Sequence, residues 1–227
     1  MDSKGRKLHA KAAQAREKGN FRQSLDFNDK ALFAYDDEND SLGFAETVAC
    51  RSITLRVYAR LHDNRRTLTL AKYEMMGAVA IARESENLEA LAMPLYNLAK
   101  LQEDLGELRS AIATYKEAVE NIKNNPPERH NRPSILADMK IHMATCEYKA
   151  GDKTALERAE KALHELKEVD VWLSGAYMRI ADMLKKDNPE KANEYLQKAS
   201  AIIDANPKLI LRKQQWEKLH DTIFISS

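Results

Sequence analysis

The segment from Leu95 to Ala118 limits the possible folds more than any other part of the sequence. On both sides of Gly106 its apolar residues recur at spacings of three and four, which is typical of amphipathic helices, and Leu105-Gly106-Glu107 is typical of a tight turn. Small residues stand where two packed helices must approach most closely: Ala99 before the turn, and Ala111 and Ala118 after it. The segment therefore predicts two antiparallel helices joined by a short turn.

The composition extends this prediction to the whole chain. The 227 residues include only 7 glycines and 6 prolines, and β-branched and aromatic residues rarely alternate with polar ones, so we expect an all-α protein. A hydrophobic content of 44% is enough for a continuous core. The 36 basic and 35 acidic residues leave a net charge of +1, which gives no global field that would attract nucleic acid or an anionic membrane.

The helix-pair pattern returns along the chain in less regular form. We expect five pairs and one further helix, Lys208 to Asp221, that caps the last pair. The pairs are expected at about 3–35, 44–84, 88–123, 134–167 and 171–204. Together they predict a single domain, 1–227, although the proline-broken segment 124–133 leaves a boundary between two half-domains as the alternative. Gly77 lies inside a predicted helix, where we expect a neighbouring backbone to approach closely.

The motif Leu-x2-Leu-Ala, followed after the turn by Ala-x3-Tyr-x2-Ala, resembles a tetratricopeptide repeat. Its matching residues are Leu95, Leu98 and Ala99 before the turn and Ala111, Tyr115 and Ala118 after it. The resemblance implies a right-handed superhelical solenoid of antiparallel helix pairs. Comparable alanines, Ala31, Ala78, Ala118, Ala162 and Ala199, are 47, 40, 44 and 37 residues apart. These spacings exceed the standard 34 and resemble the longer, degenerate repeats of bacterial regulatory proteins and trafficking adaptors.

The resemblance also implies where ligands bind, because the first helices of successive repeats line the concave face in this family. Asn97 stands where the family commonly uses Asn to hold a ligand's backbone. By repeat position, the predicted peptide-binding residues are Arg56, Arg60, Tyr96, Asn97, Lys100, His142, Tyr148 and Arg179, with His9 and Arg16 also facing outward. The Lys/Asn set with which co-chaperones clamp acidic C-terminal peptides is not found across three repeats.

Arg56 and Arg60 are four residues apart and share one face of their helix, with Arg51, Arg65, Arg66 and Lys72 nearby in sequence. One interpretation is a patch for acidic peptides, phosphate groups or RNA, since Arg holds carboxylate and phosphate through two hydrogen bonds. The alternative is a solvated helix face paired with nearby Glu.

No catalytic, cofactor or metal motif is expected to act in this chain. The phosphate-binding GxxxxGK[ST], the GxGxxG and GxSxG turns, and the HExxH and CxxC pairs do not occur. His142 and Cys146 are four apart, but zinc needs three or four ligands, so a buried Cys beside a polar His is the preferred interpretation. Cys50 and Cys146 are expected to be reduced thiols.

The leading hypothesis is therefore a non-enzymatic scaffold that binds a peptide or partner protein. The alternatives are a regulatory sensor that binds a small peptide or metabolite and acts on a separate effector chain, and RNA binding through the arginine-rich second repeat. The charged start, MDSKGRKLHAK, and the absence of long apolar runs predict a cytoplasmic protein that does not enter a membrane. We expect a monomer or weak homodimer, with a protein or peptide rather than nucleic acid as the partner.

Overall fold

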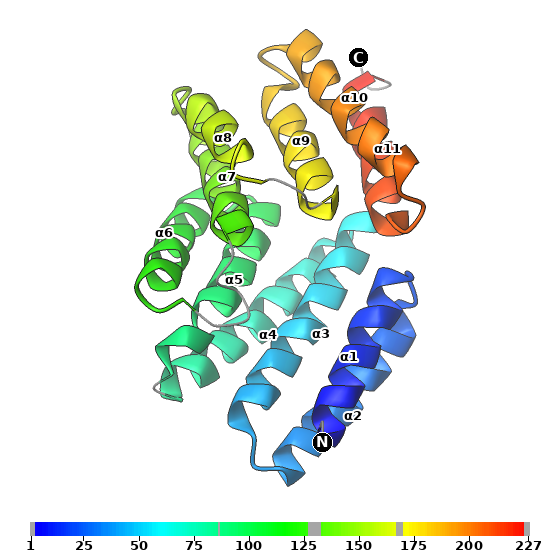
Figure 1. Cartoon of the computed structure of the whole chain (residues 1–227), viewed down its shortest axis with the longest axis vertical. Helices are drawn as coiled ribbons and strands as arrows, with labels where there is room; N and C mark the ends of the chain where they lie inside the picture. Colours follow the sequence, from blue (N-terminus) through cyan, green and yellow to red (C-terminus); the bar gives the residue numbers. More distant parts are fainter. Residues whose placement is uncertain (1–2, 86, 127–132, 167–169, 225–227) are drawn as a thin grey trace. The chain divides into compact units, whose positions relative to one another are not determined.

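In the computed structural model, residues 3–85, 87–126, 133–166 and 170–224 are described, and they form helices without any strand (Figure 1). The all-α prediction is confirmed. The chain divides into two compact units, Met1–Pro127 and Glu128–Ser227, and each is considered by itself. The boundary falls in the proline-broken segment. The single domain stays a prediction.

The first unit contains three helix pairs. Their bounds are α1 Lys4–Glu17, α2 Phe21–Asp37, α3 Ser41–Leu61, α4 Arg65–Glu84, the 3-10 helix η1 Leu88–Ala90, α5 Ala92–Asp104 and α6 Leu108–Asn124. Each first helix packs against its own second helix, and α3 also lies against α1 and α5. The predicted pairs 3–35, 44–84 and 88–123 correspond to these helices within a few residues.

The second unit contains two pairs and the cap. Its helices are α7 Pro133–Lys149, α8 Ala155–Leu163, α9 Asp170–Leu184, α10 Pro189–Ala205 and α11 Ile210–Phe224. The predicted cap packs as expected, because Leu209, Trp216 and Leu219 lie against the apolar core of α9 and α10. The Trp216 indole Nε1 also donates to the Leu196 carbonyl at 3.0 Å.

Four of the five turns within the described pairs use a residue that tolerates a left-handed backbone, and the α9–α10 turn does not. Gly19, Gly106 and Gly151 have φ of 75°, 81° and 114°, and Asp63 takes the same place after α3 with φ of 51°. Glycine adopts this conformation without steric cost, and Asp does so more readily than most residues. The turn glycines therefore end the first helices of their pairs.

The helix starts follow from capping and from proline. The Asp40 carboxylate accepts from the Gly43 N–H at 2.8 Å, which lets α3 begin three residues before the predicted Phe44. Pro94 is the third residue of α5, where its missing N–H would have no partner within the helix, so α5 begins at Ala92 after η1. The observed end of α8 at Leu163 comes before the predicted end at 167.

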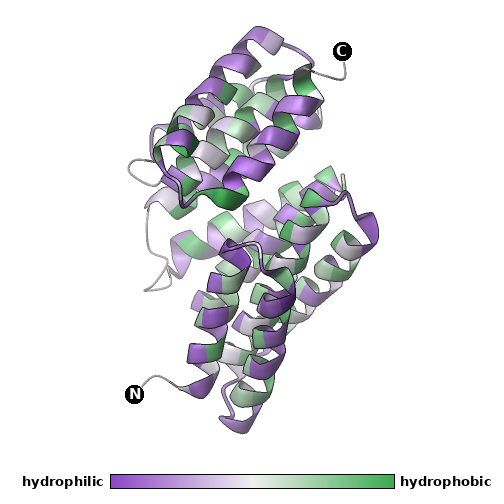
Figure 2. Cartoon of the chain, turned by 90° about the vertical axis from the view of Figure 1, so that its right-hand side faces the viewer, coloured by the Kyte–Doolittle hydropathy of each residue, from purple (hydrophilic) through white to green (hydrophobic). Residues whose placement is uncertain are grey.

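The core runs along seams of alanine between paired helices. Ala99, Ala111 and Ala118 are completely buried, as the repeat pattern predicts. Figure 2 shows apolar and polar residues on different faces of many of the helices. None of the helices within the described ranges is both long and apolar enough to cross a bilayer.

The expected close packing at Gly77 is wrong. A Cβ added to Gly77 would meet no atom of the described structure within 4 Å. The close approaches are instead at Gly5 and Gly43, where an added Cβ would lie 2.7 and 2.2 Å from the Tyr35 ring. Glycines at the starts of α1 and α3 thus make room for one aromatic side chain of α2.

Candidate functional site

Arg56 and Arg60 of α3 meet at one carboxylate of α5. The Arg56 Nε donates to the Asp104 Oδ2 at 2.5 Å, and the Arg60 Nε lies 3.7 Å from Oδ1 of the same group. Arg56 and Asp104 are largely buried, with side chains 12% and 11% exposed, whereas the Arg60 side chain is 41% exposed. Arg56 therefore joins the two helices, and Arg60 presents part of its guanidinium at the surface.

Two further basic side chains hold the turn after α5. The Arg65 Nη2 donates to the Leu105 carbonyl at 3.3 Å, and the Lys72 Nζ donates to Glu107 at 2.7 Å. A cation at the C-terminal end of a helix is favourable because the helix dipole places negative charge there. These contacts connect α4 to the turn between α5 and α6.

Arg51 makes the equivalent connection between α2 and α4. It donates to Asp29 at 3.0 Å and also to Glu74. Burial raises the pKa of Glu74, although Arg51 opposes the shift. Arg51, Arg56, Arg65 and Lys72 are thus paired with groups outside their own helices, three of them with carboxylates and Arg65 with a carbonyl. Much of this charge holds the unit together.

The α5 side of the site consists of Asn97, Lys100 and Asp104, which follow one another at helical spacing on one face. The Lys100 Nζ lies 3.8 Å from the centre of the Tyr96 ring, a cation–π contact that holds the ammonium in place. Tyr96 itself is buried, and its ring centre lies 5.9 Å from that of Tyr115. Tyr96 therefore supports Lys100 from below the surface.

Asn97 is half-buried, and its Nδ2 donates to the Met93 carbonyl at 3.0 Å. This hydrogen bond uses one N–H of the Asn97 amide and does not involve its second N–H or its carbonyl oxygen. An amide in this state can pair with the backbone of another chain. We call Arg60, Asn97, Lys100 and Asp104 the α3–α5 face.

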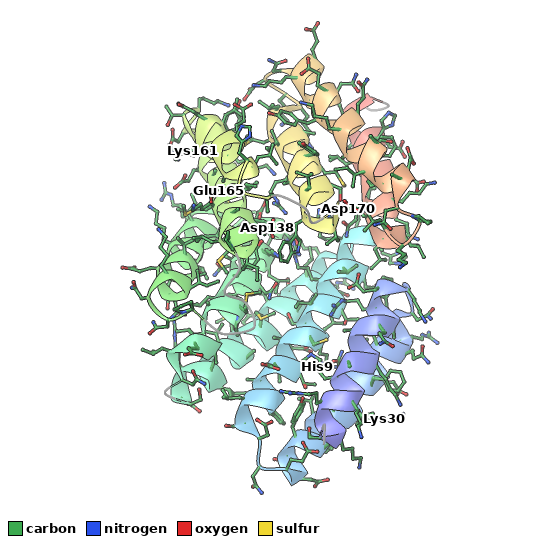
Figure 3. All side chains as sticks on the ribbon, in the orientation of Figure 1. His9, Lys30, Asp138, Lys161, Glu165 and Asp170 are labelled. Carbon is green, nitrogen blue, oxygen red and sulfur yellow. The ribbon has the colours of Figure 1, made fainter. Side chains whose placement is uncertain are left out.

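Three of the predicted peptide-binding residues, His142, Tyr148 and Arg179, lie in the second unit. His142 of α7 is buried, with its Nε2 3.9 Å from the Asp138 Oδ1, and Arg179 is half-buried on α9. Figure 3 labels Asp138 on α7. The Tyr148 hydroxyl donates to Asp187 at 2.7 Å, and the Lys153 ammonium lies 4.0 Å from the ring centre.

The Tyr148 contacts tie α7 to the turn before α10. The hydrogen bond to Asp187, together with burial, raises the pKa of Tyr148. Tyr148 is therefore occupied in packing and in a polar contact within its own unit. Repeat position predicts that Tyr148 contacts a ligand, but its hydroxyl is bonded to Asp187 from a distant segment of the chain.

Residues of α1 complete the predicted surface. His9, labelled in Figure 3, is half-buried. The Arg16 Nη1 donates to the Cys50 Sγ of α3 at 3.3 Å, and burial raises the pKa of that thiol while Arg16 opposes the shift. Cys50 and Cys146 are both buried thiols that are not joined in a disulfide. Within the described ranges, no group of three or more His, Cys, Asp or Glu side chains is placed to hold a metal ion.

Sequence reasoning did not identify Asp104, the residue that brings Arg56 and Arg60 together. An acidic residue at the end of a predicted helix, one turn after Lys100, gives no distinctive signal, because Asp and Glu are common on helix surfaces. Only the packing of α3 against α5 distinguishes it.

Comparison with known proteins finds similarity in structure alone. No protein-family model matches the sequence. No curated protein matches it either. Among solved structures, a putative kinesin light chain from Podosopora anserina with nearly identical TPR-like repeats has a TM-score of 0.57 and 13% identity, over 87% of this chain and 93% of that one.

Two further structures cover nearly all of this chain. Aspartyl phosphate phosphatase F from Bacillus subtilis has a TM-score of 0.66 and 14% identity, over 97% of this chain and 60% of that one. A Rap protein complexed with competence and sporulation factor has a TM-score of 0.62 and 14% identity, over 100% of this chain and 67% of that one. These likenesses establish the fold, which is the TPR-like helical repeat that the sequence motif predicts.

Proposed function

We propose that this chain, which has the fold of TPR-like helical-repeat proteins, is a non-enzymatic scaffold that holds a segment of a partner protein on the α3–α5 face. One observation carries the proposal. Arg60 presents its cation next to Asp104, and Lys100 presents its cation over the Tyr96 ring, one turn after Asn97, on two helices joined by the Arg56–Asp104 pair.

The chemistry of these groups specifies the class of ligand. Two cations attract carboxylates, and a side-chain amide with a donor and an acceptor pairs with an extended backbone. The expected ligand is an extended peptide segment that carries Asp or Glu. Because Asp104 and Tyr96 already hold the cations, little conformational entropy is lost when the segment binds. The Rap protein solved with competence and sporulation factor supports a binding role for this fold.

The two alternatives stay hypotheses. RNA binding gains no support from the arginine-rich stretch, because a phosphate would compete with the carboxylates that already pair with Arg51, Arg56 and Lys72. A sensor module would use the same fold, with a small peptide or metabolite as its ligand. The cytoplasmic location is likewise part of this proposal.

The test compares proteins captured from native cell extract by the whole chain and by two variants. The charge reversal Arg60→Glu with Lys100→Glu should reduce capture of the specific partner by at least about tenfold, which corresponds to about 1.4 kcal/mol. The matched control, Lys116→Glu, changes an exposed lysine on α6 and should leave capture unchanged. Equal capture by all three proteins would contradict the proposal.

The salt dependence of the captured complex separates the alternatives. Binding that falls by several powers of ten between about 50 and 200 mM salt, and that nuclease abolishes, indicates nucleic acid. Binding of a peptide segment through two cations should weaken only modestly over the same range.

A further inference from the structure

Helix α4 has a second face, opposite the one it buries in the core. The face of α4 that packs in the core includes the buried residues Leu68, Ala71 and Met75. On the solvent side Leu70, Tyr73 and Met76 are 50%, 62% and 46% exposed. A surface helix usually carries polar residues on its outer face. Three large apolar side chains within two turns therefore mark a surface that another molecule covers.

The exposed residues follow the spacing of a helix–helix seam. The seam consists of Arg66, Leu70, Tyr73, Gly77, Ala80 and Glu84. Successive members are separated alternately by four and three residues, which keeps them on one side of a helix that packs along another helix. We call these six residues the α4 seam.

Gly77 is the unusual member of this seam. No described neighbour in the chain requires a glycine there, since an added Cβ would have open space around it. Glycine lowers helix stability at an interior position. On an exposed seam, however, the bare backbone at Gly77 gives a bulky side chain from another helix room to approach.

From this seam we infer that α4 docks against α4 of a second copy of the chain, in antiparallel orientation about a two-fold axis at residue 75. Along the seam, the axis pairs positions whose numbers sum to 150, whereas a residue that flanks the seam meets the same residue of the second copy. Tyr73 then packs over Gly77 of the second copy, Leu70 lies against Ala80 of the second copy, and Arg66 meets Glu84 of the second copy. Each of these pairs occurs twice, as in any isologous interface.

The sequence of α4 is self-complementary only in this direction. An antiparallel arrangement matches large side chains with small ones and places opposite charges at both ends. A parallel arrangement would place Arg66 beside Arg66 and leave the two glycines facing each other across a gap. Met76 adds to the antiparallel contact, because it flanks the axis and meets Met76 of the second copy. Glu74, on the other flank, is held by Arg51 of its own chain.

The contact uses one helix from each chain, which is less than a typical stable interface of about 1,600 Å². The dimer is therefore expected to be weak and concentration-dependent. The α4 seam is independent of the α3–α5 face, since none of its residues belongs to that face. The inference does not depend on the proposed function.

Sedimentation velocity of the full chain over a wide concentration range tests the inference. The mass should rise from that of one chain, 25.8 kDa, toward twice that value as the concentration increases. Arg66→Glu alone and Glu84→Arg alone should each weaken association by about tenfold or more, because each reversal creates two like-charged pairs. The double variant R66E/E84R should restore it.

Two further variants make the test specific to the seam. Tyr73→Glu should abolish the dimer, whereas Phe33→Glu, a similar change at an exposed aromatic residue of α2, should not. Circular dichroism confirms that each variant is folded. A chain that stays at one mass at all concentrations, a double variant that fails to regain association, or a dimer that survives Tyr73→Glu would each overturn the inference.

Discussion

Arg56 and Arg60 are one helical turn apart, yet their surroundings differ. Both contact Asp104, but Arg56 is largely buried and Arg60 is exposed over much of its side chain. Helical periodicity places the two arginines on one face and predicts the same role for both. The difference is set by α5, whose position relative to α3 is not encoded in the local pattern. The sequence could therefore predict that the two arginines share a face but not which of them is buried against Asp104.

Replacing Arg56 with Ala should destabilise the protein by about 3–5 kcal/mol, because it leaves the buried Asp104 carboxylate without its closest partner. Replacing Arg60 with Ala should cost less than about 1 kcal/mol, as for exposed ion pairs. Urea unfolding measures both changes. The double variant Arg56→Met with Asp104→Leu should recover much of the lost stability. Equal effects of the two single replacements would mean that the ion pair with Asp104 does not join the helices.

Asp182 of α9 gives a pH dependence with a defined sign. Burial opposes its ionisation, but Lys149 at 2.5 Å and Lys185 at 2.8 Å outweigh that effect and lower the pKa of Asp182 to about 2. A carboxyl whose pKa is lower in the folded state stabilises the fold above its unfolded pKa. Its contribution is lost as the pH falls from about 4 to about 2.

The variant Asp182→Asn isolates this contribution. Wild-type stability should fall by about 2 kcal/mol more than that of the variant between pH 5 and pH 2, because one pKa unit corresponds to about 1.4 kcal/mol. Urea unfolding at a series of pH values provides the measurement. Parallel pH profiles for the two proteins would show that the lysines do not hold the carboxylate.

At the scale of elements, Tyr35 organises the start of the first unit. Gly5 of α1 and Gly43 of α3 both lie against its ring. The sequence gives neither glycine a role, because the ring that they accommodate comes from another element, and Gly43 comes before the predicted start of the second pair at residue 44. Gly77, which sequence reasoning assigned to close packing, has open space instead.

The two types of glycine predict opposite effects of one substitution. Gly43→Ala should lower stability by about 1–3 kcal/mol, since its Cβ would overlap the Tyr35 ring. Gly77→Ala should raise the stability of the single chain by about 0.5–1 kcal/mol through improved helix propensity. Thermal unfolding at low protein concentration, where the single chain dominates, checks both. Changes of the same sign would contradict the account of these helices.

The helices themselves could largely be predicted, because their signals are local. The turn at Gly106, the buried alanines and the capping helix after residue 208 all occupy their expected places. The boundaries were less predictable, because they depend on individual caps such as Asp40. Tyr96 and Tyr148 show the limit of repeat position as a guide, since both prove to be buried.

At the scale of the whole molecule, ion pairs between helices accompany the alanine seams. In the first unit Arg51 pairs with Asp29 and with Glu74, and Arg56 pairs with Asp104. In the second unit Lys149 and Asp182 join α7 to α9. A chain with nearly equal numbers of acids and bases therefore uses many of them internally. The net charge alone predicts that no global field attracts nucleic acid or an anionic membrane. Which acidic residue pairs with which basic residue can be seen only in the structure.

The most direct measurement of the central claim is photo-crosslinking in native extract from two positions of the first unit. A benzophenone amino acid at position 93, one turn before Asn97 on α5, lies next to the α3–α5 face without replacing any of its residues, and the same group at position 116 lies on the exposed side of α6. The account predicts a partner protein crosslinked from position 93 alone, with the adduct lost in the Arg60→Glu, Lys100→Glu background. A partner crosslinked from position 116 and not from 93, or an adduct at 93 that survives both charge reversals, would contradict it.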